Sequence, residues 1–154
     1  MKKISKDTLK ILVMIMGILI SVSIFLPAMA FPDSDTSFSG IDLVFGTEFV
    51  NFGSWASGEI LLSVLGILAY ILPIAIVAVV LYSKKWYLYS LVLFVLSLVL
   101  LFLMPEYIKT TVTLLNTVTE IDVNWVISYG LYIAQVLAVL GVITSLISAV
   151  KLQK

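Results

Sequence analysis

The chain has 154 residues, 62% of them hydrophobic, and a mean hydropathy of +1.19. Because soluble domains hold roughly 45 to 50% apolar residues, this composition indicates a membrane protein without a separate soluble domain. Nine lysines balance nine acidic residues, and cysteine, histidine and arginine are absent. Their absence excludes disulfide frameworks, Cys/His zinc sites and histidine-held haem. We therefore predict no catalytic, metal or cofactor site and no nucleic-acid partner.

Four apolar segments without Lys, Asp or Glu reach spanning length, at residues 11–31, 60–82, 86–104 and 126–150. A bilayer core about 30 Å thick needs about 20 helical residues, since each residue rises about 1.5 Å. The pattern predicts an all-α integral membrane protein, a four-transmembrane-helix bundle that forms a single domain over residues 1–154. The external loops, residues 32–59 and 105–125, would form a small cap.

Lysine positions predict the orientation, because positively charged residues are retained on the cytoplasmic side of a membrane. Eight of the nine lysines precede the first segment, separate the second from the third, or follow the fourth: Lys2, Lys3, Lys6, Lys10, Lys84, Lys85, Lys151 and Lys154. Eight of the nine acids fall on the other side, with only Lys109 among them. Both termini are therefore expected in the cytoplasm. Lysine without arginine suggests an AT-rich bacterial genome and hence a bacterial cytoplasmic membrane.

The N-terminal segment has an alternative interpretation. Its lysines, its apolar stretch and the sequence Ala28-Met29-Ala30 resemble a signal peptide cleaved after Ala30. However, the apolar stretch continues to Phe31 at full spanning length. We therefore expect a retained helix, and cleavage would leave three spans.

Small residues predict how the helices pack, since helices in lipid associate through close contact at such positions. Segment 126–150 carries them at steps of three or four, at Gly130, Ala134, Ala138, Gly141, Ser145 and Ala149. Gly17 and Ser21 offer similar surfaces on the first segment. The first, second and fourth segments are expected to pack closely, leaving the third most exposed to lipid. The fourth segment's stripe could instead form a homodimer seam.

Two residues inside the segments stand out. Pro73 removes a backbone donor in the middle of the second segment, which should kink that helix and leave the carbonyl of Ala69 without its usual partner. Gln135, the strongest polar group inside a segment, could bond that carbonyl or a neighbouring serine. They are the candidate hinge and polar residues.

The external loops hold the candidate partner surface. In loop 32–59 aromatic and aliphatic residues recur at steps of three or four but glycines interrupt them, which predicts short broken elements. The candidate contact residues are Asp42, Phe45, Glu48, Phe52 and Trp55. Ser57 is expected to cap the second span, with Glu59 in its first turn. The threonine-rich second loop suits a hairpin or an irregular cap.

Four spans with a tryptophan in the longer first loop resemble the layout of the claudin and peripheral-myelin group. That group's Gly-Leu-Trp and paired-Cys signature is absent, and the acidic residue that small multidrug transporters carry in their first span has no counterpart in residues 11–31. The sequence therefore favours a non-enzymatic accessory subunit or envelope factor that binds a membrane protein partner or forms a homo-oligomer. The alternative is an oligomeric channel or passive transporter of small solutes.

Overall fold

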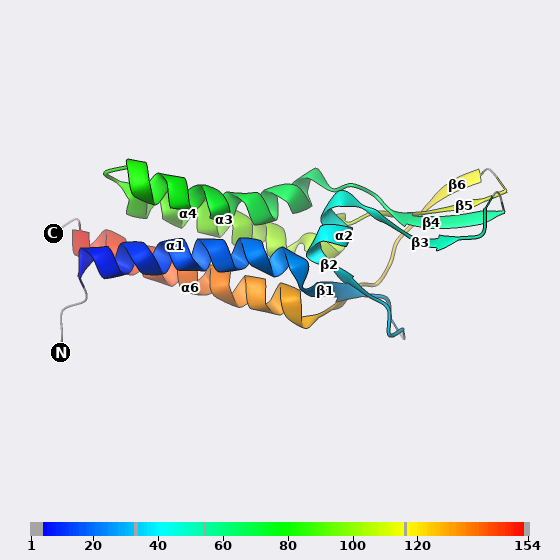
Figure 1. The fold of residues 1–154 in the computed structure, drawn as a ribbon, viewed down its shortest axis with the longest axis horizontal. Coiled ribbons are helices and arrows are strands. Elements are labelled where there is room, and N and C mark those ends of the chain that lie inside the picture. Colours follow the sequence, from blue (N-terminus) through cyan, green and yellow to red (C-terminus); the bar gives the residue numbers. More distant parts are fainter. Residues whose placement is uncertain (1–4, 33, 54, 116, 153–154) are drawn as a thin grey trace.

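A computed structural model describes residues 5–32, 34–53, 55–115 and 117–152. Within them the chain forms six α-helices, one short 3-10 helix and seven strands in two antiparallel sheets (Figure 1). The fold is therefore mixed, and the prediction of an all-α protein is wrong. Its error lies outside the long helices, where apolar and β-branched segments pair with one another as strands.

Four long helices run side by side: α1 (Lys6–Val22), α3 (Val64–Tyr82), α4 (Trp86–Phe102) and α6 (Tyr129–Leu152). Helix α1 together with η1 (Ser23–Phe25), helix α3 and helix α6 are long and apolar enough to cross a membrane, and α4 is a shorter apolar helix of 17 residues. These three candidate spans identify a multi-pass membrane protein.

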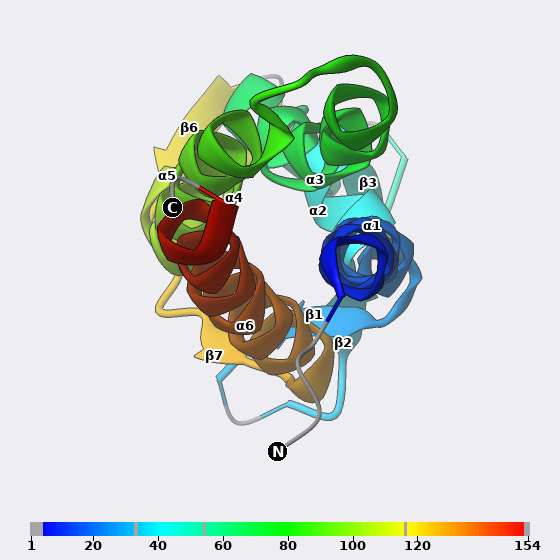
Figure 2. The same cartoon turned by 90° about the vertical axis from the view of Figure 1, so that its left-hand side faces the viewer.

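The four helices form a ring in which α1 and α4 each contact both α3 and α6 (Figure 2). Helix α4 buries Trp86, Ser90, Phe94, Ser97 and Leu101. The expected exposure of the third segment to lipid is therefore wrong. Of the close packing expected among the other three, α1 does contact both α3 and α6, but α3 and α6 lie diagonally opposite each other. Close approach needs a small residue on only one of two helices. A Cβ on Gly141 of α6 would lie 2.5 Å from the Phe94 ring.

Three of the predicted spans were too long at the end that adjoins a predicted external loop. Residues 27–30 form strand β1 (Pro27–Ala30), Ile60 ends strand β4, and Val126 begins β7 (Val126–Ile127). Helix α3 is capped by Ser63, whose hydroxyl accepts a hydrogen bond from the Gly66 N–H at 3.2 Å. The predicted roles of Ser57 and Glu59 at the start of this helix are wrong, because both lie in β4, before the helix begins.

The smaller sheet joins helices α1 and α6. Its strand order is β2 (Ser37–Ser39), β1, β7, and Met29 in the central strand pairs with Ile127. Strand β1 follows α1 and η1, whereas β7 directly precedes α6. The start of α6 is thereby fixed beside the end of α1. Ala28 and Met29, at the possible cleavage site, are fully buried here.

The larger sheet joins helices α3 and α4. Its order is β3 (Thr47–Asn51), β4 (Ala56–Ile60), β5 (Thr110–Leu114), β6 (Thr117–Ile121). Strand β4 leads into α3, and β5 follows α4 after the short helix α5 (Met104–Tyr107). The second loop is thus the β5–β6 hairpin. We call strands β3 to β6 the β-arm, because they extend beyond the helices along the bundle's long axis (Figure 1).

An aromatic cluster connects the two sheets. Phe31 lies at its centre, with ring centroids 5.0 Å from both Phe38 and Phe49 and 5.2 Å from Trp125. Phe31, Phe38 and Trp125 belong to the smaller sheet or its flanks, whereas Phe49 is in β3. Such ring pairs contribute about 0.5 to 1.5 kcal/mol each beyond their buried area. The cluster therefore holds the base of the β-arm against the smaller sheet.

Candidate functional site at the tip of the arm

The structure separates the five residues of the predicted partner surface. Asp42 caps the short helix α2 (Gly40–Phe45), where its Oδ2 accepts hydrogen bonds from the Ser39 N–H at 2.9 Å and the Ser39 hydroxyl at 2.7 Å. Phe45 is exposed at the end of α2, and Glu48 is exposed in β3. Phe52 and Trp55 lie at the β3–β4 turn. Only these last two share one site.

Two further residues join them from the β5–β6 turn. Leu114 pairs across the sheet with Ala56, and the Leu115 N–H donates to the Trp55 carbonyl at 3.1 Å. The four side chains are exposed by 70% at Phe52, 72% at Trp55, 57% at Leu114 and 71% at Leu115. We call these four residues the apolar tip. Two consecutive leucines, Leu114 and Leu115, follow a threonine-rich stretch. This pattern was the sequence signal for the second part of the tip, and the sequence analysis overlooked it.

The tip has an ordered backbone. The Phe52 N–H donates to the Ala56 carbonyl at 2.7 Å, closing the first turn, and the bond from Leu115 to Trp55 holds the second turn against it. Leu115 has φ +48°. This left-handed conformation is uncommon for a residue other than glycine, and it costs of order 1 to 3 kcal/mol where a structure imposes it. The turn thus keeps a large exposed leucine in an unfavourable conformation.

The sides of the arm are acidic. Cross-strand pairing aligns Glu48, Glu59, Thr111 and Glu120 in one row across all four strands. The Thr111 hydroxyl lies 3.4 Å from Glu59 Oε1, and Lys109 Nζ lies 3.1 Å from Glu120 Oε2. This ion pair is exposed on both sides, so it contributes about 0 to 1 kcal/mol. The row therefore presents net negative charge near the base of the arm, where β4 leads into α3 and β5 follows α5, and not at the apolar tip.

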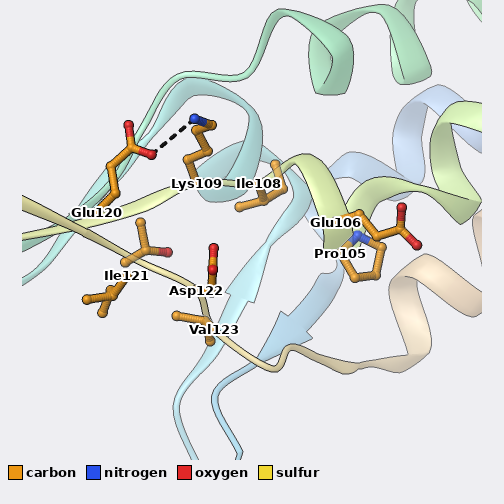
Figure 3. Close-up of a pocket in the computed structure, with 9 residues that line it drawn as sticks. Pro105, Glu106, Ile108, Lys109, Glu120, Ile121, Asp122 and Val123 are labelled. Atoms are coloured by element: carbon orange, nitrogen blue, oxygen red, sulfur yellow. Dashed lines mark hydrogen bonds and ion pairs between the residues drawn. The ribbon is translucent and has the colours of Figure 1, made fainter.

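A hollow of about 340 Å³ lies at the base of the arm, lined by residues that include Glu106, Lys109, Glu120 and Asp122 (Figure 3). Figure 3 shows Lys109 directed at Glu120, while Glu106 points away from this pair. Next to Glu106 in the chain, burial raises the pKa of Tyr107 above its usual range. Among the described residues, no group of three or more Asp, Glu, His or Cys is placed to hold a metal ion.

The small-residue stripe of α6 is buried inside this chain. A Cβ on Gly130 would lie 2.5 Å from the Pro27 carbonyl oxygen, and one on Gly141 would meet Phe94. Ala134, Ala138 and Ser145 are fully buried, and Ala149 is 9% exposed. All six residues therefore lie in contacts that the single chain makes with its own neighbouring elements.

Pro73 lies buried within α3, which continues as one helix to Tyr82. The Ala69 carbonyl, deprived of a donor by Pro73, accepts a hydrogen bond from the Ser97 hydroxyl of α4 at 2.8 Å. One residue further on, the Tyr70 carbonyl accepts from Ser21 of α1 at 2.6 Å. The structure thus brings both neighbouring helices to the turn before Pro73.

Gln135 does not contact this turn. Its Nε2 donates to the Leu101 carbonyl at 3.2 Å, near the C-terminal end of α4. The expected bond from Gln135 to the Ala69 carbonyl or a serine is therefore wrong, because Ser97 already fills the former place. Like Ser21 and Ser97, Gln135 connects two helices through a backbone carbonyl.

No family model, curated protein or solved structure matches this chain.

Proposed function

We propose that this protein is a non-enzymatic accessory subunit or envelope factor of a bacterial cytoplasmic membrane, which binds a partner protein through the apolar tip. The exposure of Phe52, Trp55, Leu114 and Leu115 carries the proposal. Clusters of large exposed apolar side chains mark interaction sites, and tryptophan, tyrosine and arginine dominate the energetics of protein interfaces.

The position of the tip favours a protein partner over the surrounding lipid. The β-arm points away from the helices along their long axis, so its tip is the part of the described chain farthest from the opposite end of the bundle (Figure 1). The five-residue strands of the arm span about 17 Å each at about 3.4 Å per residue. Lipid that surrounds the helices would therefore not cover the tip.

The charge of the β-arm indicates what kind of partner surface would complement it. Exposed carboxylates flank the arm and its base: Glu48, Glu59, Glu106, Glu120 and Asp122. Lys109 is the one lysine in this part of the described chain, and Glu120 pairs with it. The surface that complements the arm would be apolar where it meets the tip and basic where it faces the base of the arm.

The proposal includes four spans, with both termini in the cytoplasm and the arm outside. Helix α4, at 17 residues, is about 26 Å long, which is at the lower limit for a transmembrane helix. The start of α1, the turn between α3 and α4 and the end of α6 lie at one end of the bundle (Figure 1). The lysines of the predicted cytoplasmic side belong to these segments, although Lys2, Lys3 and Lys154, like Asp33 of the first loop, lie outside the described residues.

The contacts inside the bundle favour partner binding over the alternative, an oligomeric channel or passive transporter. A conducting path needs polar side chains free to contact the solute. Ser21, Ser97 and Gln135 instead donate to backbone carbonyls of neighbouring helices. These groups act in helix packing.

Site-specific photocrosslinking in cells tests the partner proposal. A photoreactive residue at Trp55 or Leu115 should yield one discrete protein adduct, whereas the same residue at Thr119, exposed on the edge strand β6, should yield much less. The variant Trp55→Ser with Phe52→Ser should lose the adduct formed from Leu115. Equal crosslinking from all three positions, or adducts with lipid alone, would contradict the proposal.

Cysteine labelling tests the orientation, because the chain contains no cysteine of its own. A membrane-impermeant thiol reagent should label Thr36→Cys in intact cells but should label Ser83→Cys only after the cells are opened. Labelling of Ser83→Cys from outside would reverse the proposed topology.

A further inference from the structure

We infer that the end of the bundle opposite the arm binds an anionic phosphate group at the level of the lipid headgroups. A hollow of about 380 Å³ is lined there by residues from the start of α1 and from the α3–α4 turn. Figure 2 views the molecule from this end. Three lysines line it, Lys6 and Lys10 from α1 and Lys84 from the turn, together with Tyr82, Ser83 and Trp86. The site is distinct from the apolar tip, and it requires only that the helices lie in a membrane.

The three lysines are arranged to act together. Lys6 and Lys10 are four residues apart on α1 and therefore share one face of the helix. Lys84 approaches from a separate element. In the described part of the chain the one ion pair joins Lys109 to Glu120, at the other end of the molecule. Asp7, the only acidic residue of the N-terminal segment, does not line the hollow.

Trp86 also lines this hollow, and it carries a buried donor. Trp86 is 1% exposed, and its indole Nε1 is buried without a hydrogen-bond partner. An indole N–H can only donate, and a buried polar group without a partner destabilises the fold. A phosphate oxygen is an acceptor that this donor could meet once a headgroup entered the hollow and the indole shifted.

Backbone geometry adds a net positive potential. Lys6 and Trp86, the first residues of α1 and α4, line the hollow, as does Tyr82, the last residue of α3. A helix carries roughly half a positive elementary charge at its N-terminus and half a negative one at its C-terminus, so the two N-termini outweigh the one C-terminus. The cap residue of α4, Lys85, makes no side-chain hydrogen bond to the first turn. Three lysines and the N-termini of two helices thus line a single hollow, together with Trp86 and its buried indole N–H. Their shared chemistry fits a phosphate diester or monoester, supplied by an anionic phospholipid or by free phosphate.

The test uses the full chain in nanodiscs that contain phosphatidylglycerol and phosphatidylcholine, with native mass spectrometry to count retained lipids. The wild type should retain phosphatidylglycerol selectively. Lys10→Gln with Lys84→Gln should lower this retention by more than the about fivefold per lysine that unspecific attraction to an anionic membrane surface accounts for. The matched control, Lys85→Gln with Lys151→Gln, removes the same charge from the same end but outside the hollow, and should lose only that unspecific part.

A second arm distinguishes the two sources of phosphate. Inorganic phosphate at millimolar concentration is added to the wild type in phosphatidylcholine nanodiscs, and Trp86 is followed by fluorescence in the background Trp55→Phe with Trp125→Phe. A saturable change that Lys10→Gln with Lys84→Gln abolishes would support the site with free phosphate as ligand. Selective lipid retention without this change would support it with the headgroup as ligand. Neither response, or equal losses in the two double variants, would overturn the proposal.

Discussion

The hydroxyl of Ser97 lies 2.8 Å from the carbonyl oxygen of Ala69, the acceptor that Pro73 leaves without its usual helical donor. This contact joins α4 to α3 at the only proline inside a long helix of the described chain. Gly17 of α1 lies on another side of the same turn, where a Cβ would be 2.5 Å from the Pro73 carbonyl oxygen. The interruption in α3 is thus stabilised by two neighbouring helices.

We predict that Ser97→Ala destabilises the protein by about 1 kcal/mol, because it leaves a carbonyl unpaired in an apolar interior. The matched control is Ser90→Ala. Ser90 is equally buried, but its hydroxyl bonds the Trp86 carbonyl of its own helix at 2.7 Å, so its loss should matter less. Reversible unfolding in mixed micelles measures both free energies.

A double-mutant cycle then tests the cause. In a Pro73→Ala background the backbone N–H at position 73 can bond the Ala69 carbonyl, so Ser97→Ala should cost little there. An unchanged cost of Ser97→Ala in that background would show that the serine acts through packing and not through the carbonyl.

Gly141 should tolerate no larger side chain while Phe94 is present. A Cβ at this position would lie 2.5 Å from a ring carbon of Phe94, which is fully buried, so the ring would have to shift to admit it. We expect Gly141→Ala to destabilise the protein by about 1 to 3 kcal/mol, as overpacking does. Thermal unfolding in detergent checks this, and Phe94→Leu should restore part of the loss. A Gly141→Ala variant as stable as the wild type would contradict this close approach of α4 to α6.

Phe31→Ala should loosen the arm more than the helices. Phe31 contacts three other rings of the aromatic cluster, and truncating a buried phenylalanine costs about 3 to 5 kcal/mol, with the lower value expected for this half-buried side chain. Hydrogen exchange should speed up in strands β3 to β6 and stay slow in α1. Phe25→Ala, at an exposed ring outside the cluster, serves as the control. Equal acceleration in both variants would rule out this role.

The purified protein should keep residues 1–30. The possible cleavage site, Ala28-Met29-Ala30, forms the central strand of the smaller sheet, with Ala28 and Met29 fully buried. A signal peptidase needs an accessible extended segment, and removing residues 1–30 would also remove the partner of β2 and β7. Intact mass spectrometry decides the matter, since a mass that begins at Phe31 would contradict this prediction.

Apolar length alone located the helices well, because a helix that spans a bilayer must be both long and uncharged. It failed at the helix ends, since residues 27–30 and 126–127 are apolar but pair as strands, with Ala28 and Met29 buried, and composition does not distinguish such strands from a helix in contact with lipid. The pairing of Met29 with Ile127 joins segments that are distant in sequence, and no local pattern encodes it.

The sequence analysis also predicted the wrong neighbours for some helices in the bundle, and for a different reason. Counting small residues on each helix treated the helices separately, whereas contact between α4 and α6 depends on the pair formed by Phe94 and Gly141. In the candidate site, the aromatic residues Phe52 and Trp55 were recognisable from composition. Leu115 was not, because its role depends on two turns that meet only in the folded chain.

The two sheets divide the four helices into pairs, and this division has a mechanical consequence. The smaller sheet clasps α1 to α6, and the β-arm clasps α3 to α4 through β4 and β5. A partner pulling on Trp55 would load α3 and α4 first. The force would reach α1 and α6 along two routes, through the aromatic cluster around Phe31 and through the contacts of the helices with one another.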